Sequence, residues 1–148
     1  MTDKHQVYLG LGSNMGDRQA LLEKAIQLIN ERVGVVTRRS SFIETEPWGF
    51  ESPNQFLNAV ILSESDKTPR EVLQVTQQIE REMGRKKKSK RMTASNKSDC
   101  QYTDRPIDID ILLYDNLTID EPDLKIPHPL MHKRDFVMKP LREICQNL

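Results

Sequence analysis

The stretch Arg105-Pro106-Ile107-Asp108-Ile109-Asp110-Ile111-Leu112-Leu113-Tyr114 predicts a buried β-strand that carries two carboxylates. Side chains alternate between the two faces of a strand, so Asp108 and Asp110 share one face and the isoleucines share the other, toward a core. The Cβ atoms of the two aspartates would lie roughly 6–7 Å apart. Because unpaired charges in an apolar strand are costly, the pattern predicts a metal site. The ordinary alternative is an Asp-x-Asp pair in a solvated turn, which the apolar flanks disfavour.

The length and composition predict one domain over residues 1–148. The 22 basic and 22 acidic residues give zero net charge, so global charge indicates neither a nucleic-acid nor a membrane partner. No apolar run approaches the roughly 18 residues of a membrane-spanning helix, and the N-terminus lacks a signal-peptide pattern. Cys100 and Cys145 form no Cys-x-x-Cys motif, which fits a reducing compartment. We therefore expect a cytoplasmic protein.

Before the carboxylate strand, the sequence predicts three strands and two helices. The strands are expected over residues 6–12, 35–45 and 56–63. The first helix is expected to begin after an Asp17 cap and to run to Arg32, with Gly34 ending it. Thr68-Pro69-Arg70-Glu71 is a capping box with proline at the first helical position, and it predicts a second helix that ends at Gly84.

The rest of the chain predicts a long loop, a turn and a last helix. Residues 85–104 have almost no apolar content and are expected to form a flexible basic loop. A short hairpin is expected near Asp115-Asn116, and a final short helix over residues 136–146. The resulting β-α-β-β-α-β order is typical of the split βαβ, or ferredoxin-like, α+β sandwich. We therefore expect an antiparallel sheet with two helices packed on one face.

The glycines near the N-terminus do not form a nucleotide-binding fingerprint. Gly10-Leu11-Gly12-Ser13-Asn14-Met15-Gly16 differs from G-x-G-x-x-G because its third glycine comes one residue late. A tight turn from the first strand into the first helix explains these glycines equally well.

Several basic residues could serve a phosphate. The run Arg85-Lys86-Lys87-Lys88-Ser89-Lys90-Arg91 is compatible with a solvated loop, a nucleic-acid contact or a mobile loop that closes over phosphates. His128 and Arg134 could hold a phosphate together, or could belong to an ordinary proline-punctuated loop.

The few aromatic residues allow a site for a flat ring. Core packing is the default role for Trp48, Phe56 and Phe136. Phe56 and Phe136 could instead stack on a heterocycle, with the Asn58 amide at its edge.

Taken together, these motifs resemble the 6-hydroxymethyl-7,8-dihydropterin pyrophosphokinase family of folate biosynthesis, from Val7 to about Ile144. The family signature is an arginine, two residues, an aspartate, an aliphatic residue, an aspartate and two aliphatic residues, and residues 105–112 match it in full. The supporting motifs are Gly12-Ser13-Asn14, Ser41-Phe42-x-x-Thr45, Phe56-Leu57-Asn58, Gln77-x-x-Glu80 with Gly84-Arg85, and Ile126-Pro127-His128 followed by Arg134-x-Phe136.

The resemblance implies transfer of pyrophosphate from ATP to the hydroxymethyl group of the pterin, with release of AMP. It implies that Asp108 and Asp110 bind two Mg²⁺ ions that bridge the ATP phosphates, and that these aspartates act in catalysis with Arg85 and Arg105. The residues that it places at ATP are Gln77, Glu80, Arg85, Arg105, Ile109, His128 and Arg134. The residues that it places at the pterin are Thr45, Glu46, Trp48, Phe56, Asn58, Asp108 and Phe136. No residue stands out as a general base.

We expect a monomer whose partners are ATP and hydroxymethyl-dihydropterin, with no nucleic-acid or membrane partner. Two alternatives stay open from the residues. One is a ferredoxin-like RNA-binding module that uses the basic loop, although the aromatic signature of such modules is absent. The other is a different metal-dependent nucleotidyl- or phosphoryl-transfer enzyme that uses the same two aspartates.

Overall fold

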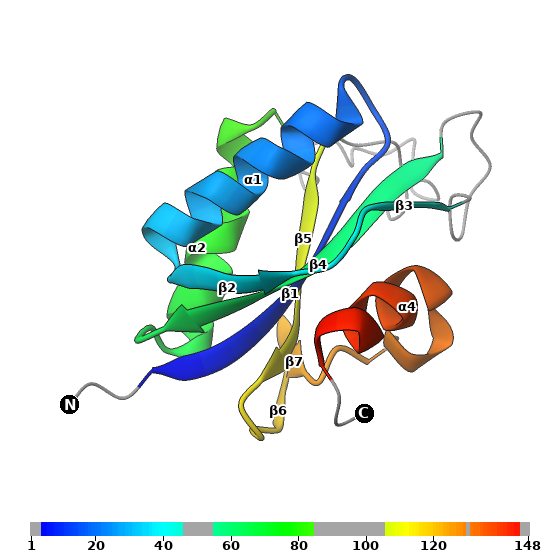
Figure 1. The fold of residues 1–148 in the computed structure, drawn as a ribbon. Helices are drawn as coiled ribbons and strands as arrows, with labels where there is room; N and C mark the ends of the chain where they lie inside the picture. The colour runs from blue at the N-terminus through cyan, green and yellow to red at the C-terminus, as the bar shows by residue number, and fades with distance from the viewer. Residues whose placement is uncertain (1–3, 46–54, 85–105, 130, 146–148) are drawn as a thin grey trace, which may run out of the picture.

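The computed structural model describes residues 4–45, 55–84, 106–129 and 131–145 (Figure 1). Its strands are β1 (His5–Ser13), β2 (Val35–Arg39), β3 (Ile43–Thr45), β4 (Phe56–Ser65), β5 (Asp108–Tyr114), β6 (Ile119–Glu121) and β7 (Leu124–Ile126). Its helices are α1 (Arg18–Arg32), α2 (Pro69–Glu82), the 3-10 helix η2 (Met131–Lys133) and α4 (Asp135–Ile144).

The main sheet has the strand order β2-β4-β1-β5, and β3 pairs with β4 beyond the end of β2. Every pairing in it is antiparallel. β1 lies between β4 and β5, and β5 is an edge strand. This order confirms the predicted ferredoxin-like α+β sandwich.

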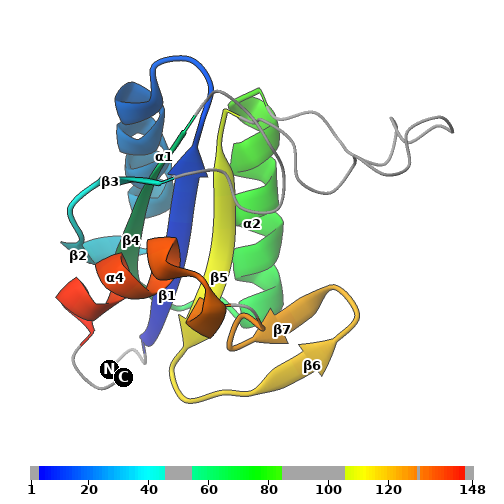
Figure 2. The same cartoon turned by 90° about the vertical axis from the view of Figure 1, so that its right-hand side faces the viewer.

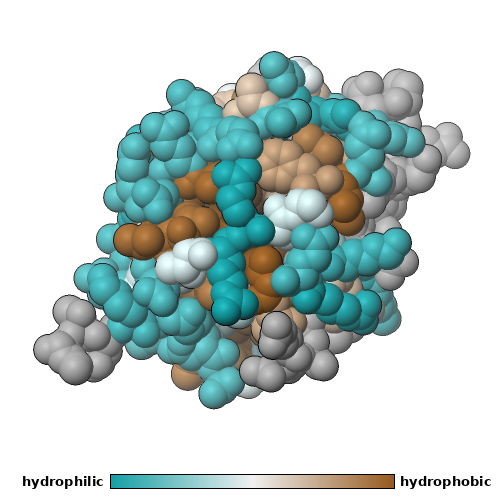
Figure 3. Space-filling view, in the orientation of Figure 1, coloured by the Kyte–Doolittle hydropathy of each residue, from teal (hydrophilic) through white to brown (hydrophobic). Residues whose placement is uncertain are grey.

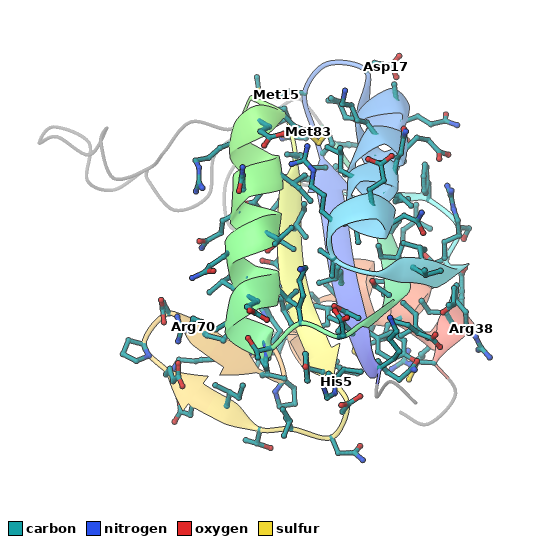
Figure 4. All side chains as sticks on the ribbon, turned by 90° about the vertical axis from the view of Figure 1, so that its left-hand side faces the viewer. His5, Met15, Asp17, Arg38, Arg70 and Met83 are labelled. Carbon is teal, nitrogen blue, oxygen red and sulfur yellow. The ribbon has the colours of Figure 1, made fainter. Side chains whose placement is uncertain are left out.

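The helices α1 and α2 cover one face of the sheet, as Figure 4 shows from the helix side. Both begin as the sequence predicts. The Asp17 carboxylate accepts the Ala20 N–H at 3.2 Å, and the capping box between Thr68 and Glu71 is complete. The core beneath the helices contains Val7, Leu9 and Leu11 of β1, each at most 3% exposed.

The third helix, α4, packs on the opposite face of the sheet, which Figure 2 shows toward the viewer. A second apolar cluster lies between α4 and the sheet, where Leu141 of α4 packs with Val60, Leu62 and Leu112 of the strands. The sequence predicts this helix over residues 136–146, but it does not predict which face the helix covers.

The predicted strand over residues 35–45 is wrong in one respect, because it is broken into β2 and β3. Ser40 lies between them, and its hydroxyl accepts the Val60 N–H at 2.9 Å. The Ser41 N–H then donates to the Glu143 carboxylate of α4 at 2.8 Å. Three residues, 40–42, belong to neither strand, and within them the Ser41 N–H is bound by α4.

The predicted hairpin near Asp115-Asn116 is also wrong. Asp115 does form a turn with a positive φ of 49°, but the strand after it does not pair back on β5. The hairpin is instead made by β6 and β7, one turn later. The Asp115 carboxylate accepts the Gln6 N–H at 2.7 Å and so fixes the turn to β1.

The β6–β7 hairpin is attached to the start of α2 through Arg70, whose position Figure 4 marks. The Arg70 guanidinium binds the Asp123 carboxylate at 2.8 Å and also forms an ion pair with Glu121. This network fixes the hairpin to the start of α2, shortly before the chain reaches His128.

The surface is mostly polar, and Figure 3 shows hydrophilic residues around short apolar stretches on the face seen in Figure 1. The exposed large apolar side chains in the described part of the chain are Met15, Val35 and Leu117. None of the helices in the described ranges is long and apolar enough to cross a membrane.

Gly34 tests the packing between α1 and the sheet. A Cβ added at Gly34 would lie 2.0 Å from the Glu64 carbonyl oxygen of β4, which is backbone and cannot move away alone. We expect Gly34→Ala to lower the free energy of unfolding by at least about 2 kcal/mol, measured by urea denaturation. Val35→Ala is the control, because Val35 is 58% exposed and its truncation should change this quantity by less than about 0.5 kcal/mol. Equal stabilities of the two variants would contradict the close approach.

Candidate active site

The two carboxylates lie where the strand pattern predicts. Ile109 and Ile111 of β5 belong to the core under α1 and α2 and are 7% and 6% exposed. Asp108 and Asp110 alternate with them and are partly exposed on the opposite face of the sheet. The prediction that both aspartates share one face is confirmed.

The carboxylate face is limited to the first part of β5. The pairing between β1 and β5 shifts register between Tyr8 and Leu9, so that Leu112 is the extra residue. Leu112 is 1% exposed and belongs to the cluster under α4, not to the core that holds Ile111. The face that carries the aspartates therefore becomes an apolar helix contact only two residues after Asp110.

Two glycines leave a strip without side chains beside the aspartates. Gly10 and Gly12 lie inside β1, with Gly10 opposite Asp110 and Gly12 opposite Asp108. On its other side Gly12 lies opposite Asn58 of β4. The suggestion that a tight turn accounts for these glycines is therefore wrong for both, and only Gly16, with a φ of 72°, lies in the turn before α1.

The Gly12 position is filled by the side chains of its neighbours. A Cβ added there would lie 2.9 Å from the Asn58 Oδ1 atom and 3.4 Å from the Phe56 ring. Asn58 is only 4% exposed, so its amide is held in place. Phe56 and Asn58 thus lie on the same face of the sheet as Asp108, across one glycine strand.

Glu80 of α2 is buried against the carboxylate strand. Its carboxylate accepts the Ile109 N–H at 2.7 Å, and the residue is 9% exposed. Because β5 is an edge strand, this N–H has no strand partner on that side, and Glu80 provides the acceptor. Gln77, three residues earlier, is exposed on the same helix. Glu80 therefore fixes the backbone between Asp108 and Asp110, a role that the sequence pattern does not reveal.

His128 and Arg134 approach the same region after the hairpin. The backbone N–H of His128 donates to the Leu112 carbonyl of β5 at 3.0 Å. Arg134 is 8% exposed and immediately precedes α4. Burial lowers the pKa of His128 below its usual 6.5, the Arg134 charge lowers it further, and the Asp108 charge opposes both. His128 thus lies within the electrostatic influence of a cation and of one of the paired carboxylates.

Some predicted site residues are not placed by the structure. Glu46, Trp48, Arg85 and Arg105 lie outside the described residues, as does the basic loop over 85–104. Thr45 is opposite Phe56 in the β3–β4 pairing, and Phe136 is in the first turn of α4.

The donor set of the aspartates fits a magnesium ion that is held together with a substrate. Within the described ranges, no group of three or more His, Cys, Asp or Glu side chains is arranged to hold a metal. Mg²⁺ is usually bound by one or two carboxylates together with waters and substrate phosphates. Asp108 and Asp110 match that need, and a cage made only of protein ligands is not required.

The fold and the paired carboxylates fit a metal-dependent phosphoryl-transfer enzyme. The model of the 7,8-dihydro-6-hydroxymethylpterin-pyrophosphokinase (HPPK) family matches residues 8–146. The chain therefore belongs to this family, and it is a pyrophosphokinase of folate biosynthesis that uses ATP and Mg²⁺. Neither the RNA-binding module nor a different metal-dependent transferase is needed to explain the residues.

Relatives named 2-amino-4-hydroxy-6-hydroxymethyldihydropteridine pyrophosphokinase cover nearly the whole chain. The protein of Porphyromonas gingivalis is 50% identical over 140 residues, which are 94% of this chain and 90% of that protein. The protein of Bacillus subtilis is 40% identical over 142 residues, which are 95% of this chain and 78% of that protein.

Solved structures of HPPK-DHPS share the fold. One, in complex with substrates, has a TM-score of 0.73 at 16% identity and covers 96% of this chain and 40% of its own. The wild-type Plasmodium falciparum HPPK-DHPS with STZ-DHP has a TM-score of 0.65 at 16% identity, and the match covers 96% of this chain and 38% of that one. This chain thus spans about two fifths of those longer chains, and the likeness concerns the fold alone.

The lowered pKa of His128 predicts a pH-dependent stability. The unfolded chain, in which His128 has its usual pKa of 6.5, takes up the proton at a higher pH than the folded protein does. The His128 contribution to stability is therefore fully present above pH 6.5 and is lost as the pH falls below it, until the folded-state pKa is passed. We expect the free energy of unfolding of the wild type to fall more steeply than that of His128→Asn between about pH 8 and about pH 5.

Urea denaturation across that range measures the difference. Asp108→Asn should steepen the wild-type dependence, because the Asp108 charge raises the His128 pKa. Asp120→Asn, in the exposed β6 strand, is the matched control and should leave the His128 contribution unchanged. Parallel curves for wild type and His128→Asn would contradict the assigned shift.

Proposed function

We propose that the pyrophosphate transfer takes place on the sheet face that carries Asp108, Gly12 and Asn58, and that the acceptor is the hydroxymethyl group of 6-hydroxymethyl-7,8-dihydropterin. The observation that carries this proposal is the register of β4, β1 and β5. It places Asn58 and Asp108 on either side of Gly12, with no side chain between them. Because Gly12 has no side chain of its own, a flat acceptor held at Asn58 can come close to a phosphate held at Asp108.

The acceptor side is formed by the end of β4. The Phe56 ring offers a flat apolar surface, and the buried Asn58 amide offers both a donor and an acceptor for the edge of a pterin. Thr45, opposite Phe56 in the pairing, belongs to the same end of the sheet. By family resemblance, Glu46, Trp48 and Phe136 complete this side.

The donor side is formed by β5 and the segment after the hairpin. The His128 backbone N–H is bound to the Leu112 carbonyl of β5, and the buried Arg134 guanidinium is of the kind that binds phosphate. By family resemblance, Gln77, Arg85 and Arg105 also face ATP. The resemblance places Ile109 there too, but its side chain is 7% exposed and lies in the core under α1 and α2, so the structure does not support a side-chain contact with ATP. Because AMP is released, the pterin hydroxyl must attack the β-phosphorus of ATP. The main task of these groups is therefore to align the nucleotide for that attack.

Asp108 and Asp110 would hold two Mg²⁺ ions, which when bound would neutralise the charge of the triphosphate oxygens. Glu80 supports the two aspartates indirectly. Its carboxylate accepts the Ile109 N–H and so fixes the backbone between them. Glu80 is thus a positioning residue in this proposal, and we assign no general base.

We further propose that the chain works as a single 148-residue domain and as a monomer in the cytoplasm, with small molecules as its only partners. The basic residues of the 85–104 loop suit a triphosphate better than a nucleic acid in this context, because the aspartates and the phosphate-facing arginines flank them in the sequence.

Loss of either aspartate tests the reaction. We expect Asp108→Asn and Asp110→Asn each to lower Mg²⁺-dependent turnover at least about 100-fold, because a carboxylate ligand of the triphosphate-bound metal is lost. Circular dichroism should show an unchanged fold. Asp120→Asn, in the exposed β6 strand, should keep full activity. Full activity in either β5 variant would refute the proposed metal site.

Gly12→Ala tests the open strip. The added methyl group would meet the Asn58 Oδ1 atom at 2.9 Å, so the amide must move and pterin binding should weaken about tenfold or more by calorimetry. In Gly10→Ala the three atoms nearest to the added methyl group all belong to Leu112, the nearest at 3.4 Å, so this variant should leave the Asn58 amide in place and change pterin affinity far less. Equal pterin affinities in Gly12→Ala and the wild type would show that Asn58 does not bind the ring.

A further inference from the structure

Arg18 occupies a position that its own helix disfavours. It is the first residue of α1, directly after the Asp17 cap, and the first turn contains no acidic residue. The positive end of the helix dipole makes a cation unfavourable there, whereas aspartate and glutamate are preferred. Contacts outside the helix must therefore account for the orientation of this side chain.

Those contacts join the ends of two strands. The Arg18 Nη1 group donates to the Gln55 carbonyl at 2.9 Å, and its Nη2 group forms an ion pair with the Glu44 carboxylate. Glu44 lies in β3, and Gln55 immediately precedes β4. One guanidinium thus bridges the two strand segments directly beside the Thr45–Phe56 pair, which joins the last residue of β3 to the first residue of β4.

The bridge and the proposed acceptor site lie on opposite faces of the same strand end. Glu44 is opposite Leu57, and Leu57 packs against the core beneath α1 and α2. Phe56 and Asn58 alternate with Leu57 and therefore face the other way, toward Gly12. Arg18 holds from the helix side the piece of β4 whose other face carries the ring-binding groups.

We infer that Arg18 is a positioning residue for the pterin side of the site, acting through Glu44 and Gln55 on Phe56 and Asn58; this inference rests on the function proposed above. A partly exposed ion pair contributes little to global stability. The Arg18 side chain is 29% exposed and that of Glu44 is 51% exposed. Removing the bridge should therefore loosen the acceptor site without unfolding the protein.

The test is calorimetric binding of the pterin to the full chain, in the presence of Mg²⁺ and a non-hydrolysable ATP analogue. We expect Arg18→Ala to weaken pterin binding about tenfold. Its Kd for the ATP analogue should change by less than about twofold, and KM for the pterin should rise more than kcat falls. Arg18→Lys keeps the charge but cannot bridge both acceptors, so it should be intermediate. It also keeps the test open if the alanine variant folds poorly.

Two further variants separate positioning from general stability. Arg32→Ala removes an ion pair with Glu82 from the other end of α1, 3.0 Å long and similarly exposed, and should leave pterin binding unchanged. The effects of Arg18→Ala and Glu44→Ala on the pterin Kd should be less than additive, because both break the same bridge.

The inference would be overturned if Arg18→Ala bound the pterin as tightly as the wild type does. It would also be overturned if this variant lost pterin and nucleotide affinity equally and had a lower Tm. Absence of pterin binding by the wild type would instead overturn the proposed function, so the two failures are distinguishable.

Discussion

The site depends on a stretch of β1 that has no side chains on one face. Gly10 and Gly12 lie opposite Asp110 and Asp108 on one side, and Gly12 also lies opposite Asn58 on the other. Any larger residue at Gly12 would displace the Asn58 amide, which is already close to the position of a Cβ. The distance between Asn58 and the Asp108 carboxylate, the proposed acceptor and metal groups, is therefore set by the width of one strand.

The two faces of the sheet divide the work. The face under α1 and α2 is a packed core. Polar side chains of these two helices bind the strand backbone and fix it, as Glu80 does for β5 and Arg18 does where β3 ends and β4 begins. On the opposite face α4 packs against the sheet (Figure 2). Asp108, Asp110, Asn58 and Phe56 lie on that same face, around Gly10 and Gly12. Rigid support from behind allows a site built on strands to hold its groups in register.

Local patterns allowed much of this to be predicted from the sequence. The alternation in residues 107–111 depends only on strand geometry, and the capping box at Thr68 depends on residues three positions apart, so both were correct. The break at Ser40, the position of the β6–β7 hairpin and the face chosen by α4 were not predictable, because each depends on a partner far along the chain, such as Glu143 for Ser41. The same reason hid the roles of Gly12 and Glu80. A glycine in a strand shows its function only when its cross-strand neighbours are known.

The most direct test of the central claim is a crystal structure of the chain with a non-hydrolysable ATP analogue, Mg²⁺ and the pterin alcohol. The account predicts metal ions on Asp108 and Asp110, the pterin against Phe56 with its edge on the Asn58 amide, and the two ligands meeting over Gly12. A pterin bound elsewhere, or metal ions that do not touch the β5 carboxylates, would contradict it.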